Sequence, residues 1–298
     1  MGLLEHTPAF DVESATALVE EYFAIRGSAQ PLPSERDQNF LLTDRAGERF
    51  VLKVANALEL PELLEAQNAV LSHLEHRVSF CPRLVPATSG DQITTIVSAN
   101  GATYLARVVR YLLGVPLATI KFHSPELLHD LGRKLGQLTR ALADFDHPAV
   151  HRDFHWDLAN GPRMLHVTLD TDLTNLPRSV IHGDANDYNV LVNPDRNVVA
   201  GLIDFGDIVY SYTVGDLAIA IAYVVLGKAD PRAAAAHVIA GYQQEFELSK
   251  DELDALWPLV RLRLRMSVHI AEQQQQQRPE NEYLGISQSL ILETLPRL

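Results

Sequence analysis

The sequence predicts an α+β fold in which a small lobe with an antiparallel β-sheet precedes a larger, mainly helical lobe. Strand-like alternation recurs between residues 38 and 112, whereas helical spacing of apolar residues prevails after residue 112. With 298 residues, 47% of them hydrophobic, the chain is long enough to bury the cores of two lobes. We therefore expect an N-terminal lobe at residues 1–112 and a C-terminal lobe at residues 113–298.

The small lobe follows from local patterns of apolar and turn residues. An acidic start and helical spacing predict a first helix, which Gly27 is expected to end. A hairpin follows, with its turn at residues 45–48 and Lys53 near the end of its second strand. The expected elements are, in chain order, a helix at 11–26, the hairpin at 38–54, a helix beginning at Pro61, and strands near 92–98 and 104–112.

The charge of the chain limits its partners. The formal net charge is −13, so the phosphates of nucleic acids and anionic membranes would both be repelled. We therefore expect neither as a partner. A small substrate that is cationic or neutral fits this charge better.

Other features predict a cytoplasmic protein. The single cysteine, Cys81, cannot form an intramolecular disulfide, and the opening segment MGLLEHTPAF lacks the basic start and apolar core of a signal peptide. The longest strongly apolar stretch has 11 residues from Leu217, too short to span a bilayer. It predicts a buried helix, most simply capped by Asp216.

The segment HGDANDYNVLVN places two chemically distinct side chains at a strand end. Asp184 and Asn189 are five residues apart between two apolar runs, and the second run begins a hairpin whose turn is NPDRN. A regular hairpin about that turn places Asn189 opposite residue 202, and Asp204 one short step beyond. Asn189 and Asp204 can then share one metal ion, while Asp184 supplies a nearby carboxylate.

This combination is what phosphoryl transfer requires. Oxygen ligands hold Mg²⁺ on the nucleotide phosphates, and a carboxylate orients and deprotonates the attacking hydroxyl. An isolated Asp–Asn pair is common in loops, because both residues favour turns. Asp204 in an Asp-Phe-Gly context and the upstream strand residue Lys53 make the kinase interpretation much stronger.

These residues also carry a family resemblance. HGDANDYNV and IDFGD, with Lys53 and the DLA of residues 216–218, resemble the motifs of aminoglycoside and choline kinases, an arrangement shared with protein kinases. Within this superfamily LPSERDQNF, FHWDLAN and LIDFGDIVY are most similar to the hydroxylysine kinase branch. The resemblance implies a protein-kinase-like fold, with nucleotide binding in the first lobe and catalysis and substrate binding in the second.

The resemblance also implies a role for each matching residue. Asp184 is the expected catalytic base, and Asn189 and Asp204 are the expected Mg²⁺ ligands. Lys53 is expected to contact the inner phosphates of ATP or GTP. Further nucleotide contacts are expected from Ser34 and Asn39, in a phosphate-covering loop that lacks glycine, and from a hinge formed by Arg110, Tyr111 and Leu112.

The partner of Lys53 departs from the family pattern. Gln67 shares a helix face with Val70 and Leu71, so it is expected to point inward and to pair with Lys53. Glu65 lies on a different face and is the alternative partner. A neutral amide is a weaker partner for lysine than a carboxylate.

A second motif has a misleading appearance. Residues 151–153 spell HRD, the catalytic triplet of protein kinases, but Leu158 occupies the fifth position after the aspartate, where a metal-binding Asn is required. We therefore expect no catalysis from this triplet. Trp156 and Asp157 are predicted to help bind the substrate, with a purely structural role as the alternative. His182 is expected to brace the catalytic loop.

The sequence therefore predicts a kinase that transfers the γ-phosphate of ATP or GTP to a small amino alcohol, such as 5-hydroxylysine. Asp207, near Asp204, is expected to bind the substrate's ammonium group. Other acceptors remain open: an aminoglycoside, choline or ethanolamine, or homoserine. A nucleotide-binding pseudoenzyme and, less favoured, a metallohydrolase are the alternatives in other functional classes.

Overall fold

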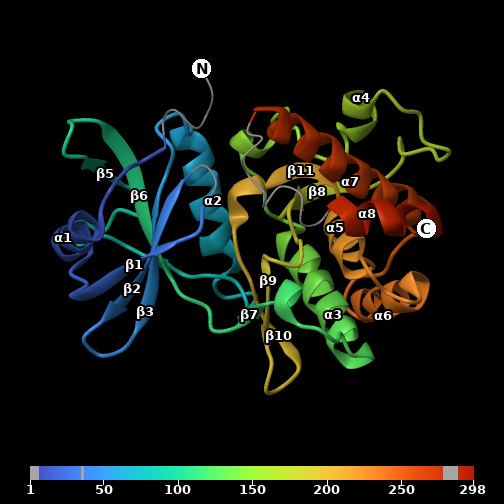
Figure 1. The fold of residues 1–298 in the computed structure, drawn as a ribbon, viewed down its shortest axis with the longest axis horizontal. Coiled ribbons are helices and arrows are strands. Elements are labelled where there is room, and N and C mark those ends of the chain that lie inside the picture. The colour runs from blue at the N-terminus through green and yellow to red at the C-terminus, as the bar shows by residue number, and fades with distance from the viewer. Residues whose placement is uncertain (1–6, 35–36, 278–287) are drawn as a thin grey trace. The chain divides into compact units, whose positions relative to one another are not determined.

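The computed structural model describes residues 7–34, 37–277 and 288–298. The chain divides into two compact units, Met1–Leu112 and Leu113–Leu298 (Figure 1). The first unit is built on a β-sheet, and the main elements of the second are helices. None of the helices in the described part of the chain is both long enough and apolar enough to cross a membrane.

An antiparallel sheet forms the body of the first unit. Its strands run in the order β1-β2-β3-β6-β4, and β5 also pairs with β6. The hairpin predicted at residues 38–54 is confirmed as β2 and β3. The strands are β1 (Gly27–Leu32), β2 (Gln38–Asp44), β3 (Arg49–Val54), β4 (Leu84–Val85), β5 (Thr94–Val97) and β6 (Thr103–Arg110).

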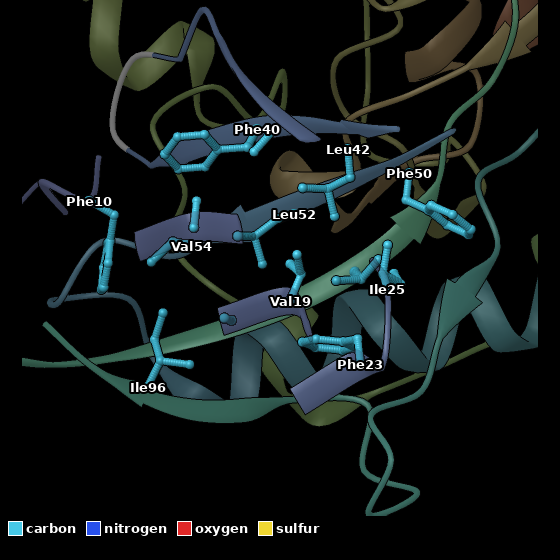
Figure 2. Packing of buried hydrophobic residues seen from close by; sticks show 14 of the residues in the cluster. Phe10, Val19, Phe23, Ile25, Phe40, Leu42, Phe50, Leu52, Val54 and Ile96 are labelled. Atoms are coloured by element: carbon cyan, nitrogen blue, oxygen red, sulfur yellow. The ribbon is translucent and has the colours of Figure 1, made fainter. Parts of the chain in front are cut away.

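Helices α1 (Val12–Phe23) and α2 (Pro61–Leu74) cover opposite faces of this sheet. Alternate strand residues such as Leu52 and Val54 point to one face, where Val19 and Phe23 of α1 complete the apolar core (Figure 2). The intervening residue Lys53 points to the other face. There α2 is bonded to the sheet through Asn68, whose side chain accepts a hydrogen bond from Arg107 of β6 at 2.7 Å.

Gly27 does not end the first helix, contrary to the sequence prediction. Helix α1 stops at Phe23, and Ala24 follows it in the left-handed conformation with φ of 54°. Gly27 is instead the first residue of β1, where a Cβ atom would lie 1.9 Å from the carbonyl oxygen of Thr43. The glycine is therefore needed for close approach of two strands rather than for a helix stop.

Helices dominate the second unit. They are α3 (Pro125–Leu142), α4 (Gly161–Leu165), α5 (Gly215–Val224), α6 (Pro231–Gln243), α7 (Lys250–Gln277) and α8 (Gln288–Thr294). The apolar stretch from Leu217 lies in α5, which is buried along almost its whole length, as predicted. Helix α7 packs against α5 and α4.

Short strands complete the second unit and position its polar loops. Strands β9 and β10 form the hairpin predicted around NPDRN, while β8 pairs with β11. A β-bulge at Ala200 interrupts the β9–β10 ladder. The strands are β7 (Val115–Pro116), β8 (Arg178–Ile181), β9 (Val190–Asn193), β10 (Val198–Leu202) and β11 (Val209–Tyr212).

Candidate active site

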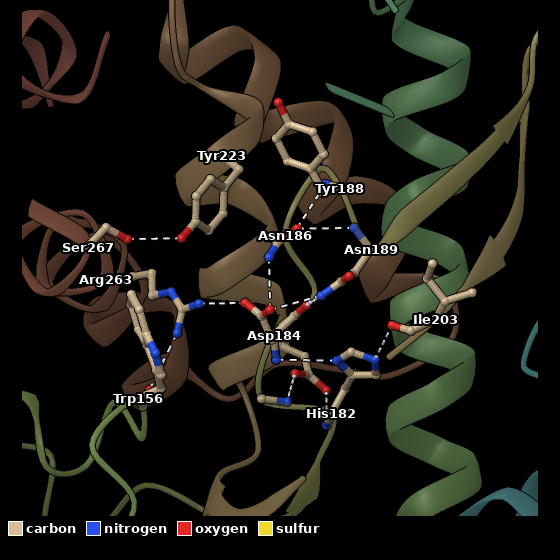
Figure 3. A network of polar contacts seen from close by, with 12 residues as sticks. Trp156, His182, Asp184, Asn186, Tyr188, Asn189, Ile203, Tyr223, Arg263 and Ser267 are labelled. Atoms are coloured by element: carbon tan, nitrogen blue, oxygen red, sulfur yellow. Dashed lines mark hydrogen bonds and ion pairs between the residues drawn. The ribbon is translucent and has the colours of Figure 1, made fainter. Parts of the chain in front are cut away.

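The carboxylate of Asp184 is the centre of a polar network in the second unit (Figure 3). It lies on the loop between β8 and β9. Its Oδ2 accepts hydrogen bonds from the side-chain amides of Asn186 and Asn189, each at 2.8 Å. Its Oδ1 accepts one from a guanidinium nitrogen of Arg263 on α7, at 2.6 Å. Charge-assisted bonds to both oxygens fix the orientation of this carboxylate.

His182 ties the Asp184 loop to the end of β10. Its Nδ1 accepts a hydrogen bond from the Asp184 amide at 3.2 Å, so its Nε2 carries the proton that is donated to the carbonyl oxygen of Ile203 at 3.0 Å. The ring is fully buried, with its centroid 4.5 Å from that of Phe205. His182 therefore braces the loop, as predicted.

Asp216 binds the same loop instead of capping α5. Its carboxylate accepts hydrogen bonds from the backbone amides of His182 and Gly183, both at 2.9 Å. Val214 occupies the N-cap position, without a side-chain cap. Burial raises the pKa of the Asp216 carboxyl, which is only 2% exposed. Asp216, which the sequence predicted to cap α5, therefore anchors the Asp184 loop, because its carboxylate faces the backbone amides of that loop.

Asn189 and Asp204 lie at adjacent strand ends. The bulge at Ala200 shifts the ladder by one residue, so Asn189 faces Ile203 instead of residue 202, and the Ile203 amide donates to the Asn189 carbonyl oxygen at 3.0 Å. Asp204 is therefore the next residue after the one opposite Asn189. It is exposed and adopts the left-handed conformation, with φ of 66°. Aspartate adopts this conformation more readily than most residues, and it occurs both in turns and at functional sites.

These two side chains suit Mg²⁺. The amide nitrogen of Asn189 serves the Asp184 carboxylate, which leaves the amide oxygen to meet a cation. Mg²⁺ is commonly held by one or two protein oxygens, with the other positions filled by water and phosphate. Within the described residues, no group of three or more His, Cys, Asp and Glu side chains is placed to hold a metal ion. A set of two protein oxygens suits an ion whose other positions are filled by water and phosphate.

Asp207 lies against the Asp184 loop. It ends a short 3₁₀ helix, Phe205–Asp207. A Cβ atom on Gly183, whose φ is 81°, would lie 2.3 Å from the Asp207 carbonyl oxygen, so only glycine permits this contact. Arg152 fixes the same turn by donating to the carbonyl oxygens of Gly206 and Ile208, both at 3.1 Å.

Trp156 and Asp157 have different surroundings. The ring of Trp156 lies 4.4 Å from the guanidinium carbon of Arg263, next to the Asp184 cluster. Asp157 is 6% exposed, and its carboxylate accepts hydrogen bonds from the Ser211 hydroxyl and the Ala159 amide. Burial raises the pKa of Asp157. The Asp157 carboxylate is thus engaged by its own turn and by β11, and its role in binding substrate stays a prediction.

The aspartate and the histidine of the HRD triplet pair with nearby surface residues. The carboxylate of Asp153 is exposed and forms an ion pair with Arg163 at 2.6 Å, and it also accepts a hydrogen bond from Asn160. His151 pairs with Asp146 at 2.7 Å. This segment lines a cavity of about 350 Å³ in which Asp184 takes no part.

In the first unit, a row of polar residues crosses three strands. Asn39 of β2 is the register partner of Lys53 of β3, which in turn is the partner of Arg107 of β6. Directly opposed residues of antiparallel strands point to the same face, so the three side chains share the α2 face. The side chain of Asn39 also donates to the Ser34 hydroxyl at 3.3 Å. Three of the predicted nucleotide-binding residues are thus neighbours.

Gln67 is buried, and its side-chain oxygen accepts a hydrogen bond from Arg107. The guanidinium of Arg107, which is 5% exposed, donates to the side-chain oxygens of Gln67 and Asn68. Gln67 therefore pairs with Arg107, the strand neighbour of Lys53, and its pairing with Lys53 stays a prediction. Glu65, the alternative, is exposed.

The predicted hinge residues are partly engaged within the first unit. The amide of Arg110 donates to the carbonyl oxygen of Arg83 at 2.8 Å, and that of Tyr111 to the carbonyl oxygen of Arg49 at 3.0 Å. Leu112 ends this unit. The amides of Arg110 and Tyr111 are thus already paired, and the contact of this segment with a nucleotide stays a prediction.

A small β-sheet unit carrying a strand lysine and a helical unit carrying the Asp184 loop are the two parts of a protein-kinase-like fold. The solved structure of an amicoumacin kinase is similar to this chain with a TM-score of 0.77 at 15% identity, over 97% of this chain and 94% of that one. This similarity confirms the fold class predicted from the sequence.

The sequence comparisons are more specific. The profile described as "Phosphotransferase enzyme family" matches residues 28–167 and 158–256. The hydroxylysine kinase of Mus musculus is 33% identical over an alignment of 328 positions that covers 94% of this chain and 87% of that protein, and that of Bos taurus is 32% identical with the same coverage. The chain therefore belongs to the phosphotransferase enzyme family, as the motifs predicted.

Proposed function

We propose that this protein transfers the γ-phosphoryl group of ATP or GTP to the hydroxyl group of a small amino alcohol. The observation that carries the proposal is the placement of Asp184 between two side-chain amides and a guanidinium, at the adjacent strand ends that carry Asn189 and Asp204. Asp184 orients the acceptor hydroxyl and takes its proton. The acceptor oxygen then forms a bond to the γ-phosphorus while the bond from that phosphorus to the bridging oxygen breaks.

Asn189 and Asp204 are the residues that would hold Mg²⁺. When bound, the ion neutralises charge on the nucleotide phosphates. Lys53 and Asn39 are proposed to bind the phosphates from the first unit, because they are adjacent on one face of its sheet. Ser34 accepts a hydrogen bond from Asn39 and is assigned to the same group.

Two observations favour an amino alcohol as the acceptor. The hydroxylysine kinases named above are 32–33% identical to nearly the whole chain. The backbone of Asp207 also lies against Gly183 of the Asp184 loop, and a carboxylate at this position would attract an ammonium group of the substrate. We therefore propose 5-hydroxylysine as the first acceptor to test, with Asp207 as its ammonium-binding residue.

The principal alternative is a domain that binds nucleotide without turnover. A screen for ADP or GDP release tests both possibilities. The acceptors are 5-hydroxylysine, ethanolamine, choline, homoserine, kanamycin and a neutral sugar, each with ATP and with GTP in the presence of Mg²⁺. We expect acceptor-dependent release with 5-hydroxylysine. Release that no alcohol accelerates, together with measurable nucleotide binding, would favour the alternative.

A further inference from the structure

Arg263 is a buried cation that the sequence motifs do not include. It lies in the middle of α7, and it is 2% exposed. One of its terminal nitrogens is 2.6 Å from Oδ1 of Asp184, 79 positions away in the sequence (Figure 3). The two residues form an ion pair in which the arginine is almost completely removed from water.

The guanidinium is itself held in place on several sides. Its other terminal nitrogen donates to the carbonyl oxygen of Trp156 at 3.4 Å, and the ring of the same residue lies 4.4 Å from the guanidinium carbon. The ring of Tyr223 lies at 5.8 Å, and the Tyr223 hydroxyl is 2.9 Å from that of Ser267, one turn further along α7. A planar cation fixed by aromatic rings has little freedom to follow a moving carboxylate.

The hydrogen bonds to Asp184 limit how another group can approach it. An ionised carboxylate offers about four acceptor sites, two on each oxygen. Among the described residues, the side chains of Asn186 and Asn189 use both sites on Oδ2, and Arg263 uses one on Oδ1. The site that is left for an incoming hydroxyl lies on the oxygen that Arg263 contacts.

We propose that Arg263 is a positioning residue that directs the acceptor hydroxyl to Oδ1 of Asp184. This inference rests on the proposed function, because it concerns the alcohol that Asp184 receives. Arg263 acts through Asp184, since its own side chain is too deeply buried to meet the substrate, although the charge of Asp207 also acts on the guanidinium. Lysine would keep the charge but would lose the planar stacking on Trp156 and the second donor to its carbonyl oxygen.

Stability alone accounts poorly for this ion pair. The neighbouring helix positions Leu259, Val260 and Met266 are all fully buried, so an apolar residue would suit position 263. Burying an ion pair costs desolvation energy that the attraction often fails to exceed. A role in orienting Asp184 explains why a charge lies in this apolar stripe.

The test compares Arg263→Lys and Arg263→Met with Arg265→Met, an exposed arginine two residues further along the same helix. ATP and 5-hydroxylysine are the substrates, and kcat and both KM values are measured. We expect Arg263→Met to lower kcat by about 10²-fold, and Arg263→Lys by a smaller factor, with the KM for ATP within about threefold of wild type. Arg265→Met should match wild type.

A double-mutant cycle with Asp184→Asn separates positioning from a general structural effect. If Arg263 acts through Asp184, Arg263→Met should cause no further loss of kcat in the Asp184→Asn background. The double variant also removes both partners of the ion pair, so it folds more readily than a variant that leaves one buried charge. The melting temperature of each variant is measured to show whether it is folded.

The outcomes are distinguishable. If wild type turns over 5-hydroxylysine but Arg263→Met retains kcat within threefold, or if its effect adds in full to that of Asp184→Asn, the role of Arg263 is refuted while the proposed function stands. If Arg263→Met does not fold, Arg263→Lys takes its place, alone and in a double-mutant cycle with Asp184→Asn. The same two criteria then apply: the loss of kcat and its additivity with that of Asp184→Asn. If wild type phosphorylates no alcohol, the proposed function and the inference both fail.

Discussion

At the scale of single residues, the Asp184 carboxylate combines contacts of two kinds. Asn186 and Asn189 belong to its own loop, so their spacing alone brings their amides to one carboxylate oxygen. Arg263 comes from a remote helix and contacts the other oxygen. Local sequence spacing thus determines the contacts of Oδ2 of Asp184, and tertiary packing determines those of Oδ1. Asp184 is the residue that is proposed to receive a proton.

Replacing Asp184 by Asn should lower kcat by about 10²- to 10⁴-fold, the usual contribution of a positioned acid or base. The KM for ATP should change little, because Asp184 is not assigned to the metal ion. Steady-state kinetics check this, with Asp153→Asn as the matched control, since Asp153 belongs to the HRD triplet but pairs with Arg163 at the surface. Turnover of the Asp184 variant within a few-fold of wild type contradicts the assignment.

A second prediction at this scale concerns the acceptor. Asp207→Asn should raise the KM for 5-hydroxylysine by roughly tenfold, because a charge-assisted bond to an ammonium group becomes a neutral one. The KM for ATP should rise much less. Asp157→Asn serves as the comparison, since Asp157 is bonded to Ser211 and Ala159. Equal effects of the Asp207 variant on both KM values would exclude this role.

The site was partly predictable from the sequence, for a physical reason. Asp184, Asn189 and Asp204 lie on one hairpin and its flanking loops, so short-range spacing predicts that they are close. The contacts of Asp216 and Arg263 depend on how distant helices pack, which no local pattern encodes. One signal was available for Arg263: it falls in phase with the apolar stripe of α7, where a buried arginine requires a partner.

At the scale of elements, strand register decides which side chains meet. The β2–β3 hairpin was predictable because the turn at residues 45–48 sets its pairing. The β9–β10 hairpin has the predicted turn, but the bulge at Ala200 shifts its far end by one residue. A bulge leaves little trace in the pattern of apolar residues, so the partner of Asn189 was misplaced by one position.

The contacts of α2 predict opposite effects for two neighbouring substitutions. Gln67→Ala removes one of the two side-chain acceptors described for the buried Arg107 guanidinium, so it should lower the free energy of unfolding by about 1–3 kcal/mol. Lys53→Ala should instead reduce activity strongly by loss of a phosphate contact, with a smaller effect on stability. Urea unfolding and steady-state kinetics of both variants test whether stability falls more in Gln67→Ala and activity falls more in Lys53→Ala. A greater loss of activity in the Gln67 variant would reverse the two roles.

At the scale of the whole molecule, the proposed function divides its residues between two compact units. Lys53 and Asn39 belong to the first, and Asp184, Asn189 and Asp204 to the second. The first unit has its own apolar core between α1 and the sheet. Units with separate cores need not unfold in one step, so a probe confined to one of them is informative.

Cys81 provides such a probe, because it is the single cysteine of the chain and lies in the first unit. It is 5% exposed, and burial raises the pKa of its thiol, so the reactive thiolate is nearly absent at neutral pH. We expect negligible alkylation by iodoacetamide over an hour in native buffer, measured by intact-protein mass, and one label per chain in denaturant. In a urea series, labelling should begin at the concentration where the first unit opens. Rapid labelling of the native protein would show that this thiol is accessible and that the packing around Cys81 opens readily.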